Sequence, residues 1–288
     1  MSSFKSKNLK DKSFQKKILN KINYFKINSN IPNDSYFKIN LSISIHCYDI
    51  KIFKELMFYI LNFFQFKWKR IQIIIHYINQ ELKTIEDIIE DVFKDKLTMD
   101  ICDTFIFIQG ENVGVDIGGF IKCLDYIKED DDYIIKIHTK SNDIWRRQMM
   151  NIFSEKGIFN SIKLLEKENI GMIGSAYNIE YFRKKFNPQF SINQFYIPMI
   201  QKMCNDMNFP FNSKNLIESY FVAGTIFICK KELLKPVINY KKYLYGLCLD
   251  LRNSEWKTGK ISQTYEHAME IMFGYIAFQM NQKLVGLY

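Results

Sequence analysis

Short β-branched runs alternate with longer amphipathic segments along most of this chain, and this alternation limits the fold more than any other feature. Strands separated by helices favour a single α/β domain with a mainly parallel sheet that is flanked by helices on both faces. We predict strands at Leu41–Cys47, Ile71–Tyr77, Thr104–Gln109, Tyr133–His138, Ile170–Gly174 and Phe221–Cys229. We predict helices within residues 50–66, 82–95, 117–129, 147–168, 192–208 and 264–281.

The net charge of +9 is concentrated near the N-terminus. Residues 1–30 hold eight lysines and one acidic residue, Asp11, so they carry +7 of that charge. We therefore predict a basic, solvated arm over residues 1–39 and one globular domain over residues 40–288. The arm leaves open a peripheral contact with a membrane, whereas the nearly neutral body argues against a nucleic-acid partner.

The six cysteines are scattered without a CxxC pair, and several lie in apolar runs, as small buried thiols do. The N-terminal stretch is polar and lacks the apolar core of a secretory signal. The longest apolar stretch, Leu56–Phe66, is far too short to span a bilayer and is interrupted by Asn62 and Gln65. These observations predict a cytoplasmic protein.

The sharpest local motif is ENVGVDIGG, which begins at Glu111 and follows a predicted strand. Ligands of parallel α/β sheets bind outside the carboxyl ends of the strands. Gly114 permits a tight turn, Asp116 can cap the next helix, and the helix N-terminus favours an anion such as a diphosphate. The same pattern also fits a plain strand-to-helix turn with a capping aspartate.

A second motif, KIHTK, closes the fourth predicted strand. Strand alternation places Lys136, His138 and Lys140 on one side, where burial without an anion would be costly. We expect a phosphate there, although the strand can also emerge into solvent at His138. His46 and His76 end other predicted strands, but no histidine spacing typical of metal sites is present.

Two arginines of the five in the chain follow this motif as Trp145-Arg146-Arg147. Arginine binds phosphate with two parallel hydrogen bonds and tryptophan can stack on a base or sugar, but a helix-surface arginine pair fits equally well. Asp130–Asp132 is similar to an acidic metal-binding motif. It precedes its strand and so lies at the wrong edge of the sheet, and we interpret it as a solvated turn.

Taken in order, these motifs resemble the rhamnan synthesis protein F family of glycosyltransferases over roughly residues 40–280. The resemblance is carried by SIHCYD (44–49), NVGVDIG (112–118), KIHTKS (136–141), Trp145-Arg146, IGMIG (170–174), FVAGTIF (221–227) and HAME (267–270). It implies a GT-A-like fold and a hexosyltransferase that uses a UDP- or dTDP-linked sugar and a glycan or glycoconjugate acceptor. L-Rhamnose or another deoxyhexose is the first expectation for the sugar, within polysaccharide biosynthesis.

The chain departs from the family pattern at two places. Ile271 follows Glu270 where family members often carry arginine, and His138-Thr139-Lys140 stands where many GT-A enzymes place an Asp-x-Asp metal clamp. Protonated lysine cannot ligate Mg²⁺, so we expect cationic side chains to replace the metal. We predict no metal site and no required cofactor, and a role for Mg²⁺ or Mn²⁺ stays open.

The resemblance divides the chain into a nucleotide-sugar-binding half, 40–145, and an acceptor half with a closing helix, 146–288. Glu270 is the first candidate for the catalytic base and Glu266 the second, four residues apart on one helix face. The donor-binding candidates are His46, Tyr48, Asn112, Gly114, Asp116, His138, Lys140, Trp145, Arg146 and Gly224. The alternatives are a nucleic-acid-binding accessory protein and a non-catalytic glycan-binding relative.

Overall fold

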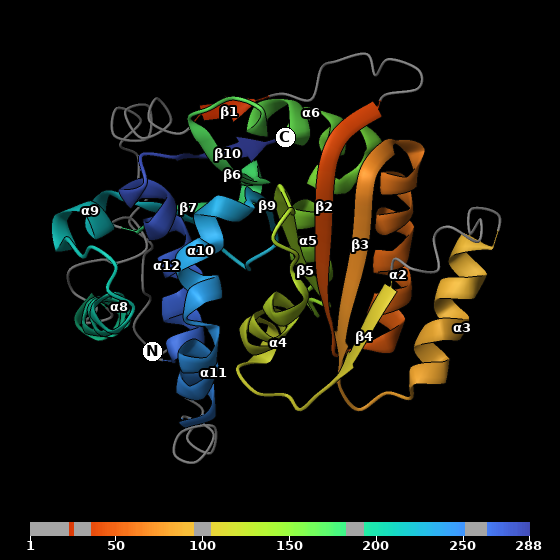
Figure 1. The fold of residues 1–288 in the computed structure, drawn as a ribbon, viewed down its shortest axis with the longest axis horizontal. Coiled ribbons are helices and arrows are strands. Elements are labelled where there is room, and N and C mark those ends of the chain that lie inside the picture. Colours follow the sequence, from red (N-terminus) through yellow and green to blue (C-terminus); the bar gives the residue numbers. More distant parts are fainter. Residues whose placement is uncertain (1–22, 26–35, 95–104, 183–192, 251–263) are drawn as a thin grey trace, which may run out of the picture.

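A computed structural model describes residues 23–25, 36–94, 105–182, 193–250 and 264–288. Its centre is an eight-stranded sheet with the order β1-β10-β6-β9-β5-β2-β3-β4 (Figure 1). The strands are β1 (Asn23–Phe25), β2 (Tyr36–Cys47), β3 (Lys67–Tyr77), β4 (Phe105–Gln109), β5 (Tyr133–His138), β6 (Ile170–Ser175), β9 (Phe227–Lys230) and β10 (Lys283–Leu287). All neighbours are parallel except β9, which is antiparallel to β5 and β6.

Helices flank the sheet on both faces (Figure 1). One apolar cluster involves α2 (Ile50–Leu61), α3 (Leu82–Phe93), α5 (Asp143–Met150) and α6 (Glu155–Leu165). The other involves α4 (Val115–Cys123), α8 (Asn193–Asp206), α9 (Ser213–Glu218), α10 (Lys231–Asn239), α11 (Lys241–Asp250) and α12 (Tyr265–Gln279). The predicted α/β class, with a mainly parallel sheet flanked by helices, is confirmed.

The predicted strand Phe221–Cys229 is wrong, because the chain turns in its middle. Its first part is β8 (Tyr220–Val222), which pairs with β7 (Ile179–Tyr181) in a separate two-stranded sheet, and its second part is β9. Gly224 and Thr225 form the turn, with φ angles of 83° and 53°. Positive φ at Thr225 is unusual for a β-branched residue, so the run of β-formers conceals the break.

Two other expected boundaries also differ from the structure. The predicted helix 147–168 is α5, a 3₁₀ turn and α6, because the Ser154 hydroxyl caps a new helix by accepting from the Gly157 N–H. Within the predicted arm 1–39, β1 pairs with β10 and β2 already begins at Tyr36. The rest of the arm lies outside the described residues.

The acidic turn at residues 130–132 fastens the amino ends of three strands. Its position at the edge opposite the strand carboxyl ends agrees with the sequence prediction, but Asp131 is fully buried rather than solvated. Its carboxylate lies 2.7 Å from Arg70 Nη2 on β3 and accepts a 2.6 Å hydrogen bond from Ser42 Oγ on β2. Asp132 Oδ2 accepts from the Asn40 N–H at 2.8 Å. The turn therefore has a structural role, because its carboxylates join β2 and β3 to the start of β5.

The helices and cysteines of the described ranges bear on the predicted cellular setting. No helix within the described ranges combines the length and apolarity needed to cross a membrane. The cysteines of these ranges are buried free thiols, and Cys102 lies outside them. Burial raises the pKa of Cys47 and of Cys123 to about 12, which makes these thiols unreactive at neutral pH.

Candidate functional site

The candidate site lies at the carboxyl edge of the sheet. The parallel strands β2, β3, β4 and β5 end there, and the antiparallel β9 begins there, so the Gly224–Thr225 turn is brought beside the end of β5. In β2 the odd-numbered side chains such as Ile43 and Ile45 join the cluster with α2. His46 points the other way, toward α4. A polar layer is thus buried between the sheet and α4.

Asp116, in the first turn of α4, is the electrostatic centre of this edge. Its Oδ2 lies 2.5 Å from Lys136 Nζ and 2.5 Å from Thr225 Oγ1. Lys136 Nζ also lies 2.7 Å from Thr225 Oγ1, and the Lys136 side chain is 1% exposed. Gly114, not Asp116, is the N-cap of α4, so the predicted capping role is wrong. The anion that neutralises Lys136 is a side chain of the protein itself.

Burial and charge act in opposite directions on this pair. Burial works to raise the pKa of Asp116, but the adjacent His138 and Lys136 outweigh it and hold the pKa below its usual 3.8. Burial lowers the pKa of Lys136, and the Asp116 carboxylate opposes that shift. The Asp116 side chain remains 20% exposed, so the ionised carboxylate can still reach a ligand.

Two backbone segments with positive φ meet at this ion pair. Gly114 and Val115 precede Asp116 with φ angles of 65° and 51°, and they face the Gly224–Thr225 turn through the Asp116–Thr225 hydrogen bond. A Cβ added at Gly114 would lie 2.7 Å from Cys248 Sγ, so no larger residue fits. A β-branched residue with positive φ, such as Val115, raises the free energy of the folded state by roughly 1–3 kcal/mol. Backbone strain of this kind is concentrated at functional sites.

We expect Asp116→Asn to lower the free energy of unfolding by about 3–5 kcal/mol, because it leaves the Lys136 ammonium buried without a counter-charge. The double variant Asp116→Asn/Lys136→Met should recover most of that loss, since both charges are then gone. Urea denaturation of the two proteins measures the difference. Equal destabilisation in the single and the double variant would show that Asp116 does not act by neutralising Lys136.

Three histidines form a row across neighbouring strands. His46 on β2 is in register with His76 on β3 and with His138 on β5. His46 Nδ1 lies 3.0 Å from His76 Nδ1, and the two rings stack. Burial lowers the pKa of His46 and His138 to about 3 and that of His76 to about 4. All three are therefore neutral at pH 7, and one Nδ1 of the stacked pair must carry a proton.

Lys140 and Arg146 have different environments, although sequence analysis gave them one role. Lys140 Nζ lies 4.4 Å above the Trp145 ring, and no carboxylate of the described chain forms an ion pair with it. Arg146 is buried, with its guanidinium bound to Glu55, Asp143 and the Lys140 carbonyl oxygen. Lys140 is thus available to an anion, whereas Arg146 holds the backbone that carries it.

Glu270 on α12 is held against the Gly224 turn. Its Oε1 accepts a hydrogen bond from the Gly224 N–H at 2.5 Å. A Cβ at Gly224 would lie 2.7 Å from Met149 Sδ and 3.6 Å from Trp145 Cζ2, so the turn is enclosed between α12 and α5. Burial raises the pKa of Tyr196 to about 12 and the Glu270 charge adds to this shift. Glu270 is thus a half-buried carboxylate fixed on the Gly224 turn, and Trp145 packs against that turn.

Glu266 lies one helical turn earlier and is 5% exposed. Burial is the main cause of the raised pKa of Cys248, and the charge of Glu266 adds to it. Cys248 packs on Gly114. The structure therefore directs Glu266 toward α11 and the start of α4. Of the two predicted carboxylates, Glu270 is the better placed to meet a substrate.

The remaining candidates line the same edge. Tyr48 is 53% exposed after β2, and its N–H donates to Thr139 Oγ1 at 2.9 Å. Asn112 Oδ1, His46 Nε2 and His138 Nδ1 are buried polar atoms without a hydrogen-bond partner among the described residues. Buried polar atoms normally have partners, which a ligand or ordered water would supply here.

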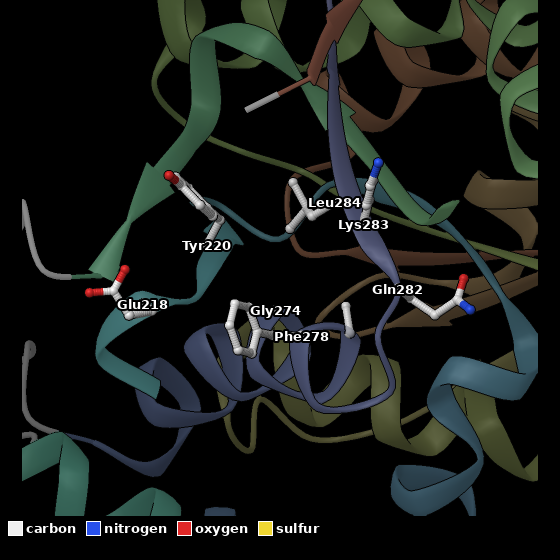
Figure 2. Close-up of a pocket in the computed structure, with 8 residues that line it drawn as sticks. Glu218, Tyr220, Gly274, Phe278, Gln282, Lys283 and Leu284 are labelled. Carbon is white, nitrogen blue, oxygen red and sulfur yellow. The ribbon is translucent and has the colours of Figure 1, made fainter. Parts of the chain in front are cut away.

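A cavity of about 440 Å³ lies elsewhere, between β8, β10 and α12. Figure 2 shows Tyr220, Phe278 and Leu284 around it, with Lys283 at the start of β10. That position is at the amino end of β10, whereas Asp116 and Lys140 lie at the carboxyl edge. The cavity is therefore separate from the candidate site.

The described side chains do not fit a divalent ion at Asp116. A cation there would have to displace Lys136, whose ammonium is 2.5 Å from the carboxylate. Within the ranges that the structure covers, no three His, Cys, Asp or Glu side chains converge as metal ligands.

Among known proteins, solved structures match this chain at low similarity. No family model and no curated protein matches the chain. The mannosyltransferase PcManGT from Pyrobaculum calidifontis, in complex with GDP-Man and Mn²⁺, is 8% identical with a TM-score of 0.41, covering 89% of this chain and 57% of that chain. The 4-diphosphocytidyl-2C-methyl-D-erythritol synthase from Anaerococcus prevotii is 13% identical with a TM-score of 0.37. The match covers 87% of this chain and 88% of the synthase chain. This chain thus spans little more than half the length of the mannosyltransferase.

Proposed function

We propose that this protein is a glycosyltransferase that moves a sugar from a nucleoside-diphosphate donor to a glycan acceptor. The observation that carries the proposal is a series of contacts from Lys140 to Trp145, from Trp145 to the Gly224 turn, and from that turn to Glu270. At one end of this series is a cation that has no carboxylate partner in the described chain. At the other end is a half-buried carboxylate. The cation suits a leaving diphosphate, and the carboxylate suits a base. A UDP- or dTDP-linked deoxyhexose such as L-rhamnose is the donor that the sequence resemblance favours.

The proposed reaction is a displacement at the anomeric carbon. Glu270 takes the proton of an acceptor hydroxyl as its oxygen forms the new C–O bond, and the anomeric C–O bond to the diphosphate breaks. Lys140 stabilises the charge that develops on the leaving diphosphate. Asp116, fixed by Lys136 and Thr225, accepts a hydrogen bond from a donor hydroxyl through its exposed edge.

Arg146 has a positioning role in this scheme. Its Nη1 donates to the Lys140 carbonyl oxygen at 2.6 Å, and its other nitrogens hold Glu55 on α2 and Asp143 on α5. These contacts fix the segment that carries Lys140 and Trp145. In this proposal the donor is bound by residues of the 40–145 half together with Gly224, and the acceptor approaches over the 146–288 half.

We expect Lys140→Ala to weaken binding of UDP or dTDP by about 10- to 150-fold, the effect of losing one charge-assisted contact. Lys122→Ala is the matched control, since Lys122 lies 4.1 Å from the Tyr245 ring in a similar cation–π contact on α4. Isothermal titration of each nucleotide in EDTA measures both variants without a contribution from metal. An unchanged affinity in Lys140→Ala, or loss of all binding in EDTA, would contradict the proposal that Lys140 replaces a metal at the diphosphate.

A further inference from the structure

A pair of exposed tyrosines follows the parallel strands β6 and β10 at the carboxyl edge of the sheet. Tyr177 lies in the 3₁₀ turn Ala176–Asn178 that follows β6, and Tyr288 follows β10, the parallel neighbour of β6. Their ring centroids are 5.4 Å apart and the rings are nearly perpendicular, at 88°. Tyr177 is 58% exposed and Tyr288 is 39% exposed. Both rings therefore present part of their surface to solvent.

The backbone connects this pair to Glu270. The Asn178 carbonyl oxygen accepts a 2.8 Å hydrogen bond from the Ala223 N–H, and the next residue, Gly224, donates to Glu270. The turn that carries Tyr177 therefore rests on the same segment that holds the proposed base.

Polar groups on both sides of Tyr177 lack partners. Ser175 Oγ and Asn178 Oδ1 are buried, and neither has a hydrogen-bond partner within the described part of the chain. A site that combines an aromatic surface with unsatisfied polar atoms suits a ligand with an apolar face and a polar rim. A pyranose ring has this character, because its C–H groups form one face and its hydroxyls form the rim.

We propose that Tyr177 and Tyr288 form the platform on which a pyranose unit of the acceptor stacks, an assignment that rests on the proposed function. Aromatic rings attract polarised C–H groups through their negative faces. A nucleobase could stack equally well on aromatic rings. The sheet order places β6 and β10 on one side of β9, however, while Lys140, His46 and Tyr48 follow strands on the other side. The nucleotide thus belongs with β5 and β2, and the acceptor with β6 and β10.

Saturation-transfer NMR on the full chain tests the platform. The probes are methyl α-L-rhamnopyranoside, methyl α-D-glucopyranoside and, separately, UDP and dTDP. We expect pyranoside signals to fall at least fivefold in Tyr177→Ser and in Tyr288→Ser but to persist in Tyr177→Phe, which keeps the ring. Tyr36→Ser is the matched control, because Tyr36 is 54% exposed at the opposite end of β2. Nucleotide signals should stay unchanged in all four variants.

Each other outcome has a definite meaning. If the wild type gives no pyranoside signal, or if that signal persists in Tyr177→Ser, the platform is wrong even when the nucleotides bind. If Tyr177→Ser removes nucleotide signals, the pair stacks a base and the assignment is overturned. If pyranoside binding depends on Tyr177 while no nucleotide binds the wild type, the platform stands and the proposed function fails.

Discussion

Replacing Glu270 by Gln is expected to lower sugar transfer by about 10²–10⁴-fold while nucleotide affinity stays within a few-fold. The amide oxygen of Gln can still accept the hydrogen bond from the Gly224 N–H, so the turn keeps its position. The amide cannot take a proton at neutral pH, so base catalysis is lost. Initial transfer rates and isothermal titration on the same preparation separate the two effects.

Glu266→Gln is the internal control for this substitution, because Glu266 lies on the same helix and is directed toward Cys248. We expect it to change transfer little. Full activity in Glu270→Gln with loss in Glu266→Gln would move the base by one turn of α12. Full activity in both would exclude α12 from the chemistry. Equal loss of nucleotide binding would indicate structural damage.

Acidification from pH 6.5 to about 4 is expected to destabilise the fold by up to about 4 kcal/mol per pH unit. Burial holds the pKa of His46, His76 and His138 near 3 to 4, below the unfolded value of 6.5. The unfolded chain therefore binds up to three more protons than the folded one in this window. The stabilisation is complete above pH 6.5 and is lost as the pH falls.

Urea denaturation at half-unit steps between pH 4.5 and 7.5 measures this slope. His76→Gln should reduce the slope of unfolding free energy against pH by about a third, the contribution of one proton, since two buried histidines remain. Asp116 does not contribute to the slope in this range, because its pKa is lowered and the stability that it provides is lost only below about pH 3.8. If the wild-type slope corresponds to one proton or less, the three histidines are not held neutral in the folded protein.

The strands with strong local signals were predictable. Tyr133–His138 is found as predicted, because its β-branched run has an acidic turn before it and a polar segment after it. The break at Gly224 and Thr225 was not predictable, since it depends on backbone angles that apolar residues on both sides conceal. Helices α9 to α11 and strand β10 were also missed: α9 has only six residues, and α10 contains Pro236, which normally interrupts a helix.

The composition of the site was predictable, but its internal pairing was not. Sequence analysis placed Asp116, Lys136 and Lys140 at one edge, yet could not show that Asp116 neutralises Lys136, twenty residues away. For the same reason it missed Thr225, which joins that pair from 109 positions along the chain. Arg146 was taken for a ligand-binding residue because its partner Glu55 lies 91 positions away in the sequence. Such pairings arise only from the tertiary fold.

The pairing of β1 with β10 has a consequence for how the protein is made. β10 lies between β1 and β6, so residues 23–25 and the edge of β6 find their neighbour only when residues 283–287 are available. A nascent chain that has been synthesised only through β9 therefore has an incomplete sheet in which the β6 edge is unpaired. Long-range pairing of this kind is slow, and exposed edges invite association between nascent chains. The pairing of residues 283–287 thus determines when the edge of β6 is covered.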